Sequence, residues 1–195
     1  LYFVCAGLLA AALVVPALPV AAQDSISAAR KSSQKRTIVG FTESAQILPG
    51  DIVIRAKVDT GARTSSLHAQ DIIPFTRNGR LWVRFHITNR ENRTQMFERP
   101  VVRHVRIKDL TGPSLSRPVI MLGICVADVF RVTEVNLSNR TGFNFPLLIG
   151  RRFMRQAIMV DPGRQFTRAP RCDISPAALR ELDAIPGLPA QDMGE

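Results

Sequence analysis

The chain has 195 residues, 46% of them hydrophobic, which is enough to bury the core of one domain with short appendages. The formal net charge is +10, but the Lys and Arg residues are spread along the sequence rather than gathered in one block. Aromatic residues make up only 6% and no nucleic-acid recognition motif is present, which argues against a specific nucleic-acid binder. A solvated basic surface explains the charge, and attraction to an anionic envelope surface or an acidic substrate is the functional alternative.

The N-terminal segment has the pattern of a secretory signal. Residues 1–15 are apolar, Pro16 and Pro19 then break the run, and residues 20–22 are small, as a signal peptidase requires. This predicts a cleavable signal peptide over residues 1–22 and a mature protein in the periplasm or outside the cell. A membrane anchor is the alternative, but the apolar run is shorter than the ~20 residues that span a bilayer.

The rest of the chain is predicted to be a flexible leader followed by a β-rich domain. Residues 23–36 are polar and lack a hydrophobic period, which is typical of a leader. From residue 37 to residue 170, short apolar runs alternate with turn signals, which predicts an all-β domain closed as a barrel. The predicted strands cover residues 37–41, 51–58, 68–75, 81–87, 94–97, 101–107, 119–124 and 129–135. Turns are indicated at Pro49-Gly50, Asn78-Gly79, 89–92 and 111–114.

Helix is predicted at only two places. Residues 151–156, directly after Gly150, form one short candidate. The C-terminal tail over residues 171–195 holds the other, at residues 176–182. There Ser175 is a good N-cap and the following proline suits the first helical position.

Two cysteines lie beyond the predicted signal peptide, Cys125 and Cys172. In an oxidising compartment they could form a disulfide that ties a mid-chain strand to the C-terminal segment. Two separate buried thiols are the alternative, because the sequence does not give their distance. No Cys-x-x-Cys motif is present, so neither redox catalysis nor a Cys-based zinc site is indicated.

The motif that carries chemistry is Asp59-Thr60-Gly61, which follows the apolar strand over residues 52–58. Aspartic peptidases present a catalytic carboxylate in this way. Gly61 lets the backbone approach the catalytic centre, and the Thr60 hydroxyl can fix the turn. Asp59 alone could be an ordinary turn residue. However, residues 147–150 read Leu-Leu-Ile-Gly, the apolar strand ending in glycine that closes around this loop in retroviral-type aspartic peptidases.

With both elements, the chain resembles a known bacterial family. Residues 57–69 in particular are similar to the retropepsin-like aspartic endopeptidases historically labelled "ATP-dependent zinc protease", and the resemblance extends over about residues 38–168. It implies a retropepsin-like closed β-barrel that hydrolyses peptide or protein substrates without a cofactor or a metal. The implied catalytic residue is Asp59, and the residues that shape its loop are Thr60, Gly61, Ala62 and Gly150.

Aspartic peptidase chemistry requires two carboxylates that share one proton. The chain contains one Asp-Thr-Gly and is too short for a two-lobed enzyme, so a second copy is predicted to supply the other Asp59 across a two-fold axis. Asp161, in Met-Val-Asp-Pro-Gly, is the intrachain alternative. A turn role is favoured for it, because the next residue is a proline and has no hydroxyl.

Two features depart from the retroviral pattern, the residue at position 63 and a flap that cannot be assigned. Arg63 stands where viral enzymes carry an aspartate, so Arg151 of the Gly-Arg element loses its usual partner. Both arginines are therefore candidate substrate or dimer contacts. The turn at residues 89–92 is either a flap over the site or a plain surface hairpin.

Rival functions rest on weaker patterns. The three histidines, His68, His86 and His104, match neither a zinc-protease helix nor a zinc finger, and no ATP-binding loop is present. The sequence thus predicts a periplasmic aspartic endopeptidase that acts as a homodimer. A catalytically silent binding module for peptides or envelope components, on the same barrel, is the main alternative, and a zinc-dependent hydrolase is the third reading.

Overall fold

The computed structural model describes residues 36–107 and 115–183. These residues belong to one compact unit. The predicted signal peptide, nearly all of the predicted leader, and the predicted turn at 111–114 lie outside the described residues. Within the described part of the chain, no helix has the length and apolar character needed to cross a membrane.

The described residues form a β-structure with two short helices, as predicted. The helices are α2 (Arg151–Met154) and α3 (Pro176–Asp183). The strands are β1 (Thr37–Leu48), β2 (Ile52–Val58), β3 (Ser65–His68), β4 (Gln70–Arg77), β5 (Arg80–Thr88), β6 (Thr94–Pro100), β7 (Arg103–Ile107), β8 (Leu115–Val126), β9 (Val129–Ser138), β10 (Leu147–Ile149) and β11 (Ile158–Gln165).

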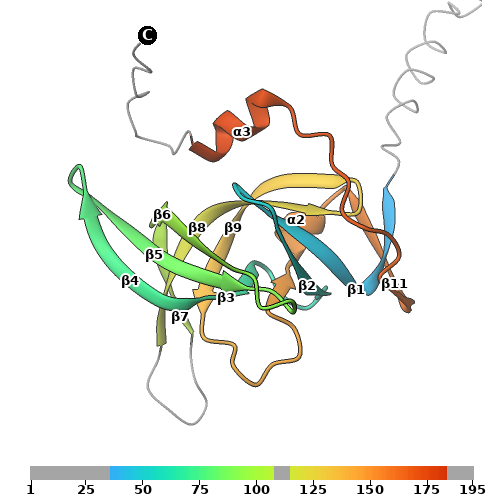
Figure 1. The fold of residues 1–195 in the computed structure, drawn as a ribbon. Coiled ribbons are helices and arrows are strands. Elements are labelled where there is room, and N and C mark those ends of the chain that lie inside the picture. Colours follow the sequence, from blue (N-terminus) through green and yellow to red (C-terminus); the bar gives the residue numbers. More distant parts are fainter. Residues whose placement is uncertain (1–35, 108–114, 184–195) are drawn as a thin grey trace, which may run out of the picture. The chain divides into compact units, whose positions relative to one another are not determined.

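Six strands close into a barrel. Their order is β1-β2-β10-β3-β9-β8, and β8 pairs back onto β1 to complete the ring (Figure 1). The short strand β10 runs parallel to β2 and antiparallel to β3, so it lies between the two strands that flank the Asp59 loop. The predicted all-β, retropepsin-like closed barrel is therefore confirmed.

A second, three-stranded sheet consists of β4, β5 and β6, shown in green at the left of Figure 1. The Asn78-Gly79 turn joins β4 and β5, with φ angles of 50° and 72° at the two residues, as expected for a tight hairpin. Alternation along β5 buries Val83, Phe85 and Ile87 against the barrel core. The second sheet thus shares one hydrophobic core with the barrel.

One predicted strand is divided in the structure, and of the two alternatives for the turn at 89–92 the plain surface hairpin fits better. The predicted strand over residues 68–75 is two strands. β3 ends at His68 and belongs to the barrel, whereas β4 belongs to the second sheet. The turn at 89–92 joins β5 to β6, near the Gln95 side chain, which lies directly against Gly50. Gly50 is at the opposite end of β2 from Asp59, roughly 20 Å away for a seven-residue strand, so this turn does not cover Asp59.

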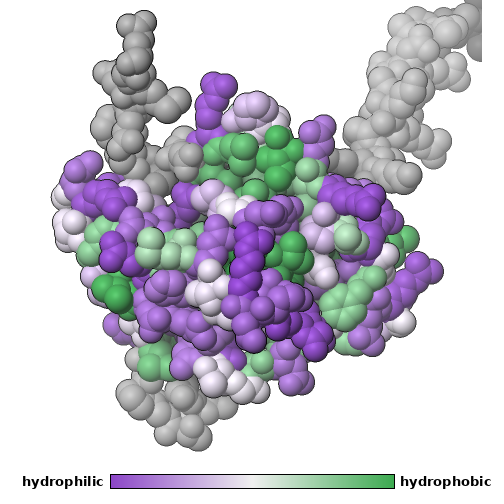
Figure 2. All heavy atoms as spheres, viewed as in Figure 1, coloured by the Kyte–Doolittle hydropathy of each residue, from purple (hydrophilic) through white to green (hydrophobic). Residues whose placement is uncertain are grey.

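The C-terminal segment closes one side of the barrel. Cys125 on β8 and Cys172 form a disulfide, and Leu182 of α3 packs beside it. The Ser175 hydroxyl accepts a hydrogen bond from the Ala178 N–H at 3.2 Å and caps α3, as the sequence indicated. On the face shown in Figure 2, hydrophilic side chains cover most of the surface, with smaller apolar patches between them.

Candidate active site at the Asp59 loop

The Asp59 loop begins where β2 and β10 end side by side. The Asp59 N–H donates to the Ile149 carbonyl at 2.9 Å. The carboxylate Oδ1 accepts hydrogen bonds from the Gly61 N–H at 2.9 Å and the Ala62 N–H at 3.3 Å. Within the described residues Oδ2 has no hydrogen-bond partner and Asp59 forms no ion pair. The half-buried carboxylate is therefore oriented by the loop while one oxygen stays available.

The Gly-Arg element that follows β10 clamps this loop from the other side. The Arg151 guanidinium donates to the Thr60 carbonyl at 2.8 Å and the Gly61 carbonyl at 2.7 Å. Its backbone N–H donates to the Ala62 carbonyl at 2.8 Å. The carboxylate partner that Arg151 lacks in the sequence is thus replaced by two main-chain oxygens. Arg63, the departure from the viral pattern, has an exposed side chain.

Gly150 allows the close crossing of β10 behind the loop. A Cβ at this position would lie 2.5 Å from the Thr64 carbonyl carbon and 2.6 Å from its oxygen, so only glycine fits. The Gly150 N–H donates to the Ser65 hydroxyl at 3.2 Å. The predicted loop residues are therefore brought together with the glycine of the downstream element.

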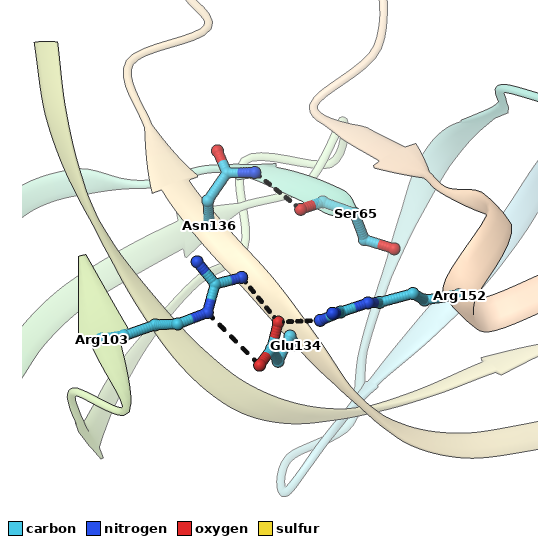
Figure 3. Close-up of polar contacts among 5 residues, drawn as sticks. All are labelled: Ser65, Arg103, Glu134, Asn136 and Arg152. Atoms are coloured by element: carbon cyan, nitrogen blue, oxygen red, sulfur yellow. Dashed lines mark hydrogen bonds and ion pairs between the residues drawn. The ribbon is translucent and has the colours of Figure 1, made fainter. Parts of the chain in front are cut away.

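A buried amide supports the loop from β9 and was not identified from the sequence. The Asn136 side-chain amide donates to the Ser65 carbonyl at 2.8 Å and accepts from the Ser66 hydroxyl at 3.0 Å. Figure 3 shows Asn136 directed at Ser65. The available signal was a polar residue at the end of an apolar strand, together with two serines next to the motif.

A charged cluster lies two residues before Asn136 on β9. Glu134 on β9 accepts a hydrogen bond from Arg103 of β7 at 2.7 Å and also pairs with Arg152 of α2 (Figure 3). The hydrogen bond from Arg103 holds the pKa of Glu134 below its usual value, and Arg152 acts in the same direction. The cluster joins the Gly-Arg element to β7 and β9.

Arg140 interacts electrostatically with the Asp59 carboxylate without forming an ion pair with it among the described residues. Arg140, in the loop between β9 and β10, donates from its backbone to His68 Nδ1 at 2.8 Å, and its guanidinium lies over the Phe143 ring. Burial lowers the pKa of Arg140, the charge of Arg117 lowers it further, and the Asp59 carboxylate raises it. Arg140 and Asp59 are therefore within electrostatic range of each other.

The residues considered for a zinc site or for a second catalytic carboxylate do not form such sites among the described residues. The three histidines lie on β3, β5 and β7, and no group of three or more His, Cys, Asp or Glu side chains suited to a metal occurs among the described residues. Asp161, the intrachain alternative to a second Asp59, lies on β11, pairs with Arg164 at 3.2 Å and accepts from the Gly163 N–H at 2.9 Å. Both contacts are local to β11, at the point where its pairing with β1 becomes irregular.

Curated relatives match this chain over part of their length. A probable alpha-L-glutamate ligase from Shewanella pealeana is 36% identical over 146 residues, which is 73% of this chain and 32% of that protein. One from Desulfotalea psychrophila is 38% identical over 115 residues, 57% of this chain and 25% of the relative. The chain thus spans about a third of the length of the curated relatives that it matches.

A solved structure and a family model also match this chain. The protein Lpg0085 of unknown function from Legionella pneumophila is 34% identical, with a TM-score of 0.60, over 68% of this chain and 98% of its own. Residues 38–171 match the RimB-like family, described as retropepsin-like aspartic endopeptidase RimB. This range contains the barrel strands, the Asp59 loop and Gly150. The chain belongs to the RimB-like family of retropepsin-like aspartic endopeptidases.

Proposed function

We propose that this chain is an aspartic endopeptidase in which Asp59 activates the hydrolytic water. The observation that carries the proposal is the state of the Asp59 carboxylate, with one oxygen held by two loop N–H groups and the other free of partners among the described residues. In such chemistry an ionised carboxylate takes a proton from water, while a protonated partner polarises the scissile carbonyl. Thr60, Gly61, Ala62 and Gly150 maintain the geometry.

The second carboxylate comes from another copy of the chain in this proposal. The chain contains one Asp-Thr-Gly, and Asp161 is already engaged with Arg164 and Gly163. A two-fold axis next to the Asp59 loop would bring two Asp59 side chains together. Because like charges only about 3 Å apart cannot both ionise, the pair would share one proton. The active form is therefore a homodimer.

Acidic peptides are the proposed substrate class. Arg140 lies within electrostatic range of Asp59, and the chain carries a net charge of +10, so negatively charged peptides would be attracted to the site. The curated relatives are named as probable alpha-L-glutamate ligases, which points to glutamate-containing peptides.

The proposed location is the periplasm or the exterior. The apolar segment at residues 1–15, with small residues at 20–22, supports export. The Cys125–Cys172 disulfide also supports it, because such bonds persist in oxidising compartments.

The test compares Asp59→Asn with Asp161→Asn on a peptide library that includes glutamate-rich and neutral sequences. Asp59→Asn should abolish cleavage without changing the circular dichroism spectrum, whereas Asp161→Asn should retain cleavage. Sedimentation of the wild-type protein should show a dimer, and chelators should leave the rate unchanged. Cleavage by Asp59→Asn at the wild-type rate, or cleavage by a strict monomer, would contradict the proposal. Peptide binding without hydrolysis would favour the binding-module alternative instead.

A further inference from the structure

A hollow of about 510 Å³ opens beside the Asp59 loop, between that loop, α2 and β11. Four of its lining residues are arginines: Arg63, Arg151, Arg152 and Arg155. None of the lining residues is acidic. The others, which include an apolar group on α2 and β11, are Thr60, Met154, Gln156, Ile158 and Val160.

The charges of these arginines are poorly compensated within the described residues. Arg151 donates to neutral main-chain carbonyls, which leaves its charge in place. Arg152 shares the single carboxylate of Glu134 with Arg103. Arg63 and Arg155 form no ion pair with any described residue. Four cations around one hollow repel each other, and a bound anion would remove that repulsion.

We propose that this hollow binds a phosphate group, either as free phosphate or as the headgroup of a phosphorylated lipid. The planar guanidinium presents two parallel donors that match phosphate oxygens. A phosphate monoester carries a charge of about −1.5 to −2, so it offsets more than one arginine, whereas a carboxylate offsets one. Met154 and Ile158, which also line the hollow, are buried, so part of its wall is apolar and a charge interaction beside that wall is strengthened.

The position of the hollow couples it to subunit pairing. Thr60 lines the hollow and is the neighbour of Asp59 in sequence. Any arrangement that joins two Asp59 side chains therefore also brings two arginine-lined hollows toward the same axis. Bound phosphate would reduce the repulsion between the copies and favour the dimer. This second step rests on the proposed homodimer, whereas phosphate binding itself does not.

The binding test uses isothermal titration of the full chain with inorganic phosphate at low ionic strength. Arg63→Gln/Arg155→Gln is the hollow variant. Arg90→Gln/Arg93→Gln, on two exposed arginines of the β5–β6 turn, removes the same charge elsewhere. Phosphate should bind the wild type and the control variant equally, and the hollow variant at least tenfold more weakly. No binding to the wild type, or equal losses in the two variants, would overturn the site.

Two further experiments distinguish free phosphate from a lipid headgroup, and the phosphate site from the proposed homodimer. Binding to vesicles with phosphatidic acid, but not to phosphatidylcholine vesicles, would identify a lipid headgroup if it is lost only in the hollow variant. Sedimentation in phosphate and in chloride of equal ionic strength tests pairing, and phosphate should raise the dimer fraction of the wild type and the control variant but not of the hollow variant. Phosphate binding with an unchanged monomer would overturn the coupling and the homodimer while the phosphate site stands. Dimerisation without phosphate binding would overturn the phosphate site and the coupling, while the homodimer stands.

Discussion

The two oxygens of the Asp59 carboxylate differ in their surroundings, and this difference comes from the tight turn that carries them. Gly61 and Ala62 direct their N–H groups at Oδ1, and a Cβ on Gly61 would lie 3.1 Å from that oxygen. Because glycine has no Cβ, the loop backbone can approach Oδ1 closely without a side chain covering the carboxylate. Arg151 then fixes the turn by binding the carbonyls of Thr60 and Gly61.

Gly150→Ala should destabilise the protein by about 1–3 kcal/mol, because the added Cβ would overlap rigid backbone. The overlap is with the Thr64 carbonyl group, at 2.5 Å and 2.6 Å, and no side chain can move aside to relieve it. Urea unfolding followed by circular dichroism measures the change. Gly163→Ala is the matched control, since its nearest atom is Asp161 Oδ1 at 3.3 Å and it should change stability by less than about 0.5 kcal/mol. Equal effects of the two variants would show that the crossing behind the loop tolerates a side chain.

At the level of elements, Glu134 joins three segments that are far apart in sequence. It lies on β9 and receives Arg103 from β7 and Arg152 from α2. Because α2 follows Gly150 directly, the cluster connects β7 to the element that clamps the Asp59 loop. All three side chains are partly exposed, so the cluster adds little to the stability of the protein. Its main effect is to orient α2 relative to β7 and β9.

Glu134→Gln should lower the free energy of unfolding by about 1 kcal/mol at neutral pH, the upper range for partly exposed pairs. The folded state holds the pKa of Glu134 below its usual value. The contribution of the carboxylate is therefore present above the unfolded value of about 4.3 and is lost as pH falls through the lower folded value. The stability gap between wild type and variant should close as pH falls below about 4.3.

Unfolding curves between neutral and acidic pH measure that gap. Glu91→Gln, on an exposed residue of the β5–β6 turn, is the control and should match the wild type at every pH. A gap that stays constant as the pH falls would mean that the amide, rather than the loss of charge, disturbs the site.

Elements with local signals could be predicted from the sequence, and those set by strand register could not. The Asn78-Gly79 turn and the Ser175 cap depend on neighbouring residues, and both occur where the sequence indicated them. Asn136 meets Ser65 across 71 positions of the chain, and only the parallel pairing of β3 and β9 brings them together. The division of the predicted strand at residues 68–75 likewise follows from the barrel, which keeps β3 and releases β4.

At the level of the whole molecule, several contacts attach the C-terminal segment to the barrel, and three of them are a buried carboxylate, a disulfide and an apolar contact. Glu43 is fully buried and accepts hydrogen bonds from the Thr167 N–H at 2.9 Å and its hydroxyl at 2.7 Å. The Cys125–Cys172 disulfide follows. Leu182 of α3 then packs directly on Gly123, where a Cβ would lie 2.8 Å from its Cδ1 atom. A buried carboxylate, a covalent bond and an apolar contact thus hold one segment in place.

Replacing both cysteines, Cys125→Ala/Cys172→Ala, should lower the free energy of unfolding by up to about 4 kcal/mol. This is the chain-entropy estimate for a cross-link between residues 47 positions apart. Thermal and urea unfolding with and without a phosphine reductant measure the loss. Reductant should destabilise the wild type by the same amount and leave the double variant unchanged, because only the wild type has the cross-link to lose. If reductant leaves the wild type unaffected and alkylation of the unreduced, unfolded protein labels both residues, the two thiols are separate in solution. The C-terminal segment would then depend on its non-covalent contacts, which include those of Glu43 and Leu182 and the hydrogen bond from the Arg171 N–H to the Ala127 carbonyl.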